Sequence, residues 1–210
     1  MSHRSRNNRG FTITELIVAL GIASVIMTVI ILRQSAYTDG AALTNLADDI
    51  GSTISQAQTY GIGVKELSTG SSDFSAAYGL AFSLLASDGS NSAYIYFADR
   101  LQPVANKIYD GNWACPIGGT SECLSKTDIS RGNVISSLCA VINGGPDQCN
   151  IGRVDISFAR PSTEASILFF DLSGGATNPA NMKGAKIILT SPGGKTRSVT
   201  VYTTGQISIQ

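Results

Sequence analysis

The chain has 210 residues, and its 15 basic and 15 acidic residues give a formal net charge of zero. This length suits one domain with an appendage, and the charge balance disfavours both a strongly basic nucleic-acid binder and an acidic tail protein. Charged residues make up 14% of the chain, below the ~25% of ordinary soluble domains, which favours an exported, β-rich protein. The single histidine, His3, nearly excludes histidine-based catalytic triads and zinc sites.

The first 32 residues have the pattern of a membrane anchor. Residues 1–10 carry three arginines and no acidic residue, and no charge interrupts the run from Leu16 to Leu32. The segment 11–32 is ~33 Å long as a helix, enough to span a hydrocarbon core of ~30 Å. The positive-inside rule then places the N-terminus in the cytoplasm and the rest of the chain outside. We therefore expect a single-pass protein of the cell membrane.

An ordinary secretory signal explains this segment less well. A cleavable signal needs small residues after its apolar run, whereas the chain continues with Arg33-Gln34-Ser35-Ala36-Tyr37. A plain signal anchor does not explain Glu15, because a carboxylate near one end of an apolar helix is costly and usually functional. No side chain between Phe11 and Leu32 offers Glu15 a positive charge, so it either snorkels to the interface or pairs with another cation.

The residues around Glu15 match a known processing signal. They read Arg9-Gly10-Phe11-Thr12-Ile13-Thr14-Glu15-Leu16. This run resembles the prepilin processing site of type IV pilins and type II secretion pseudopilins. The resemblance implies that prepilin peptidase, a membrane-embedded aspartic peptidase and methyltransferase, cuts between Gly10 and Phe11 and that Phe11 is then N-methylated. It also implies that the new α-amine is the cation that pairs with Glu15.

Two residues depart from the usual pattern of that family. Thr14 stands where an aliphatic residue is more common, and Leu32 stands where many major pilins have a helix-breaking proline. The second departure favours a minor pilin or pseudopilin. The resemblance implies a structural subunit rather than an enzyme, with no cofactor or metal. Such a subunit is held in membrane lipid, processed, and packed with other pilin subunits into a helical filament on the extracytoplasmic side.

Two other functions stay open at this point. The filament could carry a ligand-binding head, with DNA or an adhesion target as the ligand, or the chain could be an anchored surface protein that never assembles. Removing the three leader arginines leaves a net charge of −3, which argues against a strong electrostatic site for DNA. DNA is therefore the weaker candidate partner.

The helical pattern continues beyond the membrane segment, over residues 33–62. One face carries apolar residues at spacings of three or four: Leu43, Leu46, Ile50, Ile54 and Ala57. We predict one long helix from about Thr12 to about Tyr60, whose outer half lays this stripe on a globular head. Three glycines in that half are expected to weaken or bend it.

Residues 63–210 change to alternating patterns and glycine turns, which are typical of an antiparallel sheet or sandwich. The predicted strands are Ala77–Leu84, Ala93–Ala98, Cys123–Ile129, Val134–Ile142, Val154–Phe158, Ser166–Asp171, Ala185–Thr190, Arg197–Thr203 and Gln206–Ile209. The fold class is therefore α+β, with a long N-terminal helix, transmembrane in its first half, packed on a β-rich head. The segment 195–209 predicts a terminal hairpin and loosely resembles the last strands of H-class minor pseudopilins of type II secretion.

Four cysteines lie within 35 residues of the predicted head: Cys115, Cys123, Cys139 and Cys149. Their spacing does not suit zinc, and an even number in an exported, loop-rich region predicts two disulfides. Three pairings are open. Neighbours along the chain can pair, or Cys123 and Cys139 can staple a hairpin.

The head offers one weak candidate for a cation site. Asp99, Asn106 and Asp110 lie on a probable loop and could offer oxygens to calcium. Their spacing is not that of an EF-hand, and no glutamate closes the loop. Solvated turn residues are the favoured interpretation, so we predict no metal site.

Overall fold

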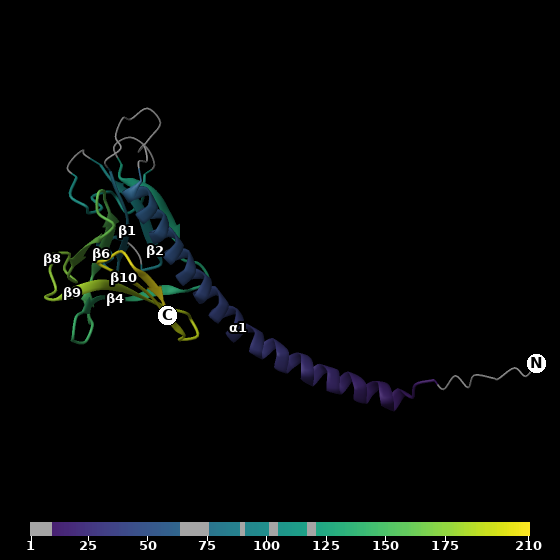
Figure 1. Ribbon diagram of the computed structural model, residues 1–210. Helices are drawn as coiled ribbons and strands as arrows, with labels where there is room; N and C mark the ends of the chain where they lie inside the picture. Colours follow the sequence, from purple (N-terminus) through teal and green to yellow (C-terminus); the bar gives the residue numbers. More distant parts are fainter. Residues whose placement is uncertain (1–9, 64–75, 89–90, 101–104, 117–120) are drawn as a thin grey trace, which may run out of the picture. The chain divides into compact units, whose positions relative to one another are not determined.

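The computed structural model describes residues 10–63, 76–88, 91–100, 105–116 and 121–210. The predicted leader, apart from Gly10, lies outside these residues. The chain divides into two units, Met1–Thr38 and Asp39–Gln210. One helix, α1, belongs to both, and the described strands belong to the second unit (Figure 1).

The helix α1 extends from Ile13 to Ile62, which confirms the predicted continuous helix and adds two residues to its C-terminal end. Its glycines do not end it. A Cβ atom on Gly61 would lie 2.2 Å from the carbonyl oxygen of Phe158, so a glycine is needed there for the helix to approach the sheet. The glycine that was expected to weaken the helix therefore allows close packing.

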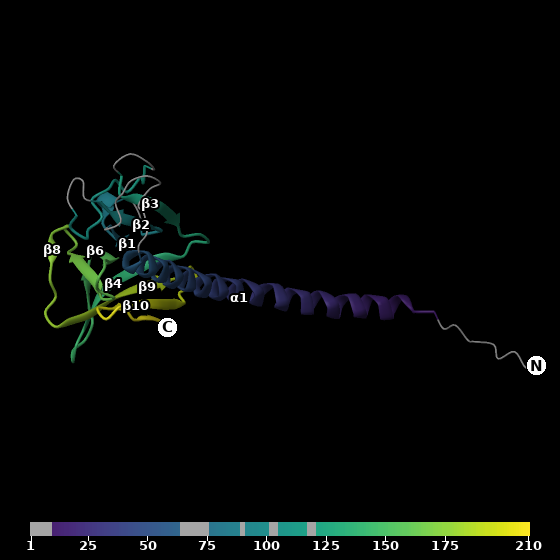
Figure 2. The same ribbon diagram turned by 45° about the horizontal axis from the view of Figure 1, so that its top comes forward.

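The described strands form two antiparallel sheets. Their bounds, with those of the short 3₁₀ helix η1, are β1 Ala77–Ser83, η1 Ala86–Asp88, β2 Ala93–Asp99, β3 Cys123–Asp128, β4 Val134–Ile142, β5 Gln148–Ile151, β6 Arg153–Phe158, β7 Ala165–Phe170, β8 Ala176–Thr177, β9 Met182–Thr190, β10 Thr196–Tyr202 and β11 Ile207–Ile209. A six-stranded sheet has the order β3-β2-β1-β6-β7-β8, and a five-stranded sheet has the order β11-β10-β9-β4-β5. In the view of Figure 2, β2 and β3 lie above the C-terminal half of α1 and β9 and β10 below it.

All nine predicted strands are confirmed, and so is the terminal hairpin of β10 and β11. The prediction missed β5 and β8. Both are short, and most of their residues are exposed, so neither has the apolar alternation that marks a half-buried strand. The strands β3 and β4 belong to different sheets, so the hairpin that Cys123 and Cys139 were considered to staple does not exist.

The main core lies between α1 and both sheets. The helix contributes residues that are at most 1% exposed: Leu43, Ala47, Ile50, Ile54 and Ala57. The predicted Leu46 is partly buried and packs against this core, and Ala47, which the prediction did not include, is fully buried in it. The spacings of 4, 3, 4 and 3 keep the five buried helix residues on one face of the helix. Buried residues of both sheets complete this core, among them Leu80, Ile156, Ile187 and Val199.

A second cluster covers the other face of the six-stranded sheet. Every residue of strands β1 and β2 is buried, which explains why the sequences of both strands are nearly continuous runs of apolar residues. Ile95 and Phe97 of β2 pack there against Tyr109, which is 1% exposed. Tyr109 belongs to the loop 105–116, so this loop shields that face of the sheet from water.

A buried ion pair fastens this loop to β6. The fully buried Asp155 accepts hydrogen bonds from Arg153 Nε at 2.9 Å and Nη2 at 2.6 Å, and from the Tyr109 backbone N–H at 2.9 Å. Arg153 Nη2 also donates to the Tyr109 carbonyl. The guanidinium lies 5.6 Å from the ring centre of Trp113 and 4.9 Å from that of Phe170, which adds cation–π attraction.

We expect Asp155→Ala to lower the free energy of unfolding by about 3–5 kcal/mol, because it leaves the Arg153 charge buried without its partner. The matched control is Asp147→Ala, which breaks the ion pair with Lys186. Both side chains of that pair are 27% exposed, so the loss should be at most about 1 kcal/mol. Denaturant unfolding of the detergent-solubilised chain measures both variants. Equal losses in the free energy of unfolding would contradict the claim that the buried ion pair contributes more than the exposed one.

Candidate functional site

The N-terminal candidate residues lie at the very start of α1. Thr12 caps the helix, since its Oγ1 accepts a hydrogen bond from the Glu15 backbone N–H at 3.3 Å and its carbonyl accepts one from the Leu16 N–H at 3.1 Å. Thr12 and Glu15 have the spacing of a capping box, a signal in the sequence that the prediction missed. Glu15 also lies in the first turn, where the helix dipole favours a negative charge.

An uncovered apolar surface follows Glu15. The stretch Ile13–Ile31 of α1 is long and apolar enough to cross a membrane, and none of it is buried. An open groove of about 500 Å³ runs along one side of its first turns, lined by Thr12, Thr14, Glu15, Val18, Ala19 and Ile22. Phe11, just before the segment, is exposed, and the large exposed apolar side chains within it are Ile13, Leu16, Ile17, Val18, Leu20, Ile22, Val25, Ile26, Met27, Val29, Ile30 and Ile31. A surface of this extent needs lipid or other apolar helices to cover it.

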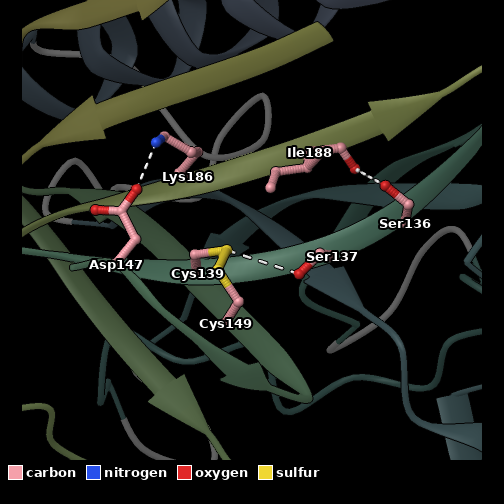
Figure 3. Close-up of a disulfide and its surroundings, with 7 residues drawn as sticks. All are labelled: Ser136, Ser137, Cys139, Asp147, Cys149, Lys186 and Ile188. Atoms are coloured by element: carbon pink, nitrogen blue, oxygen red, sulfur yellow. Dashed lines mark hydrogen bonds and ion pairs between the residues drawn. A yellow bond between two sulfur atoms is a disulfide. The ribbon is translucent and has the colours of Figure 1, made fainter. Parts of the chain in front are cut away.

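The four cysteines form the two disulfides expected, and the neighbours along the chain are the ones that pair. Cys115–Cys123 ties the loop 105–116 to the first residue of β3. Cys139–Cys149 ties β4 to the edge strand β5 (Figure 3).

The close-up also shows how the turn between β4 and β5 is held. Lys186 of β9 donates to Asp147 within that turn, and the Ser137 hydroxyl lies 3.6 Å from the Cys139 sulfur. The disulfide and the ion pair secure a strand of only four residues at the edge of the sheet. These contacts stabilise the fold.

The loop candidates Asp99, Asn106 and Asp110 come together. Asp99 accepts hydrogen bonds from the backbone N–H groups of Asn106 at 3.3 Å and Lys107 at 2.6 Å. The Asn106 side chain donates to Asp110 at 2.7 Å, and the Asp110 N–H donates to Glu122 at 2.7 Å. The prediction of solvated turn residues is wrong for Asp99, which is 2% exposed. Within the described ranges, no group of three or more His, Cys, Asp or Glu side chains is placed to hold a metal.

Glu122 is the residue of this cluster that the sequence did not indicate. It is 3% exposed, and among the described atoms its Oε1 has no hydrogen-bond partner. Burial raises the pKa of Glu122, the Asp110 N–H lowers it, and the charges of Asp99 and Asp110 raise it again. The folded protein therefore binds a proton at Glu122 more readily than the unfolded chain does.

Glu122→Gln should stabilise the protein by about 1 kcal/mol at pH 7, because the amide keeps an acceptor for Asp110 and removes a buried charge. A raised pKa in the folded state means that the favourable contribution of wild-type Glu122 is present below its unfolded pKa of ~4.3 and is lost as the pH rises. The advantage of the variant should therefore shrink toward pH 4. Urea unfolding across this range tests the prediction, and a difference that does not change with pH contradicts it.

Comparison with known proteins bears on the N-terminal segment. Residues 5–31 match the family model described as the prokaryotic N-terminal methylation motif. Neither a comparison with curated proteins nor one with solved structures found a match. The matched range contains Gly10, Phe11, Glu15 and the whole of the uncovered apolar stretch Ile13–Ile31. The N-terminus is therefore that of a type IV pilin-like substrate of prepilin peptidase, and this motif indicates a structural, pilin-like role.

Proposed function

We propose that the chain is a minor pilin or pseudopilin that is cut between Gly10 and Phe11, N-methylated at Phe11, and assembled through α1 into a helical filament. The observation that carries this proposal is the fully uncovered apolar surface of Ile13–Ile31, which directly follows the methylation motif. A head with its own core does not need this surface for folding. The surface is therefore available first to lipid and then to other subunits.

The membrane is the first environment of this surface. With the arginines of residues 1–9 held in the cytoplasm, the apolar segment spans the bilayer and the head lies on the extracytoplasmic side. In a filament, the same segments cover one another. Gly21, Ala23 and Ser24 provide small surfaces where helices can approach closely. A repeated contact whose rotation does not close on itself then generates an open helix.

Glu15 gives this assembly its register. Cleavage after Gly10 creates a positive α-amine on Phe11, four residues before the carboxylate. In an apolar bundle of helices, a carboxylate without a cationic partner is costly in free energy. A subunit therefore enters the filament at a position where Glu15 pairs with the amine of its own chain or of a neighbouring subunit. A neighbour's amine fixes the axial stagger between subunits, because other staggers leave both charges unpaired.

Expression with and without prepilin peptidase tests the proposal against a plain membrane anchor. We expect the precursor to stay in the membrane without the peptidase, and a shorter product to form with it and to enter the sheared filament fraction. A product that is processed but never found outside the membrane contradicts assembly. A chain that the peptidase leaves uncut contradicts the proposal altogether.

A further inference from the structure

The turn between β4 and β5 contains an asparagine that is followed by a glycine. Asn143 and Gly144 are the only Asn-Gly pair in the sequence, and they come directly after β4 ends at Ile142. Both residues are exposed. Because glycine has no side chain, its backbone nitrogen can approach the side-chain carbon of the preceding asparagine with little steric hindrance. An attack of the backbone on an asparagine side chain therefore meets the least hindrance at this pair.

The turn leaves both reacting groups free. Within the described part of the chain, neither the Gly144 N–H nor the Asn143 side chain makes a hydrogen bond. A Cβ atom on Gly144 would have no neighbouring atom within 4 Å, so the space around this residue is open. Gly145 follows, and two glycines in a row give the backbone the freedom to rotate. The attack therefore breaks no contact of the fold.

We propose that Asn143 is a site of spontaneous deamidation in the folded protein. The Gly144 nitrogen attacks Cγ of Asn143, so that a new N–Cγ bond closes a succinimide ring and the Cγ–Nδ2 bond breaks. The proton of the Gly144 nitrogen leaves with Nδ2 as ammonia. Water then opens the ring at either of its two carbonyls, which gives aspartate or isoaspartate without oxidation or reduction. No enzyme is needed, because the chain already holds the two groups together.

The reaction changes both the charge and the backbone of the turn. Either product replaces a neutral amide by a carboxylate, so the turn gains one negative charge. Isoaspartate also adds a methylene to the main chain between β4 and β5. The Cys139–Cys149 disulfide joins these two strands (Figure 3), and the Asn143 N–H donates to the Asn181 carbonyl at 2.9 Å. Both contacts survive the reaction, so the head stays folded around the modified turn.

Mass spectrometry of the full-length chain in detergent tests this proposal. The folded chain is incubated at mildly alkaline pH in heavy-oxygen water and digested, and the deamidated fraction is measured at Asn143 and Asn181. Asn181 is the internal control, because it is also exposed but is followed by Met182, whose side chain hinders the attack. We expect at least about tenfold more deamidation at Asn143, with heavy oxygen in the product and both aspartate and isoaspartate present.

Asn143→Gln is the matched variant. Glutamine keeps the amide and the neutral charge, but the same attack would have to close a larger ring, so the signal at this position should nearly vanish. Equal fractions at Asn143 and Asn181 would overturn the proposal. So would an Asn143 that reacts in the denatured chain and not in the folded one, because the fold would then protect the turn. Aspartate without isoaspartate would contradict ring closure by Gly144.

Discussion

Glu15→Lys should nearly abolish incorporation of the subunit into filaments while leaving cleavage after Gly10 largely intact. The substitution places a second positive charge beside the amine of Phe11, inside an apolar bundle that has no anion to offer. Breaking a buried pair from one side costs about 3–5 kcal/mol, or more than a hundredfold in the equilibrium for entering the filament. The measurement compares the subunit in sheared filaments with the amount processed in membranes.

A second variant separates charge pairing from capping, since Glu15 has the spacing of a capping box with Thr12, whose hydroxyl accepts a hydrogen bond from the Glu15 backbone N–H. Glutamine serves a capping box as well as glutamate does, but it carries no charge. Glu15→Gln should therefore fail to assemble, as Glu15→Lys does, and Glu15→Asp should be milder than either. If Glu15→Gln enters filaments like wild type, the carboxylate caps the helix or snorkels to the interface, and charge pairing is wrong.

Gly10→Val should block processing almost completely and leave the precursor in the membrane. A Cβ on Gly10 would have no neighbouring atom within 4 Å, so the substitution does not disturb the chain itself. Its effect would fall on the peptidase, whose cleft must accept an extended backbone at this position. The measurement is the ratio of precursor to product on a gel when the peptidase is co-expressed.

Gly21→Val is the matched control for this variant. A Cβ on Gly21 also has no neighbour within 4 Å, but the residue lies eleven positions beyond the cleavage site. Processing of Gly21→Val should be normal, while its packing against other helices should be impaired. Normal cleavage of Gly10→Val would mean that the peptidase does not select this glycine.

The parts of the fold that follow local patterns were predictable. Helix α1 and nine strands come from the 3.6-residue and two-residue periods of apolar side chains, which mark buried faces directly. The missed strand β5 carries mainly polar residues at a sheet edge, so its pairing depends on the Cys139–Cys149 disulfide and on β4 rather than on a local apolar pattern.

The grouping of Asp99, Asn106 and Asp110 was predictable from one stretch of sequence, but the contacts of Asp155 and Glu122 were not, because their partners are not neighbours in the sequence. Asp155 and Tyr109 are 46 residues apart, and Glu122 and Asp110 are 12 residues apart. Nothing near Asp155 in the sequence indicates which backbone groups it will bind. The capping role of Thr12 is the opposite case, since the threonine and Glu15 were readable as a local pattern.

The N-terminal mass of the processed protein tests the central claim most directly. Co-expressed with prepilin peptidase, the chain should yield one product of 200 residues that begins with N-methylated Phe11. A product that begins elsewhere, for example after Ala36, would identify an ordinary signal peptide and contradict the account.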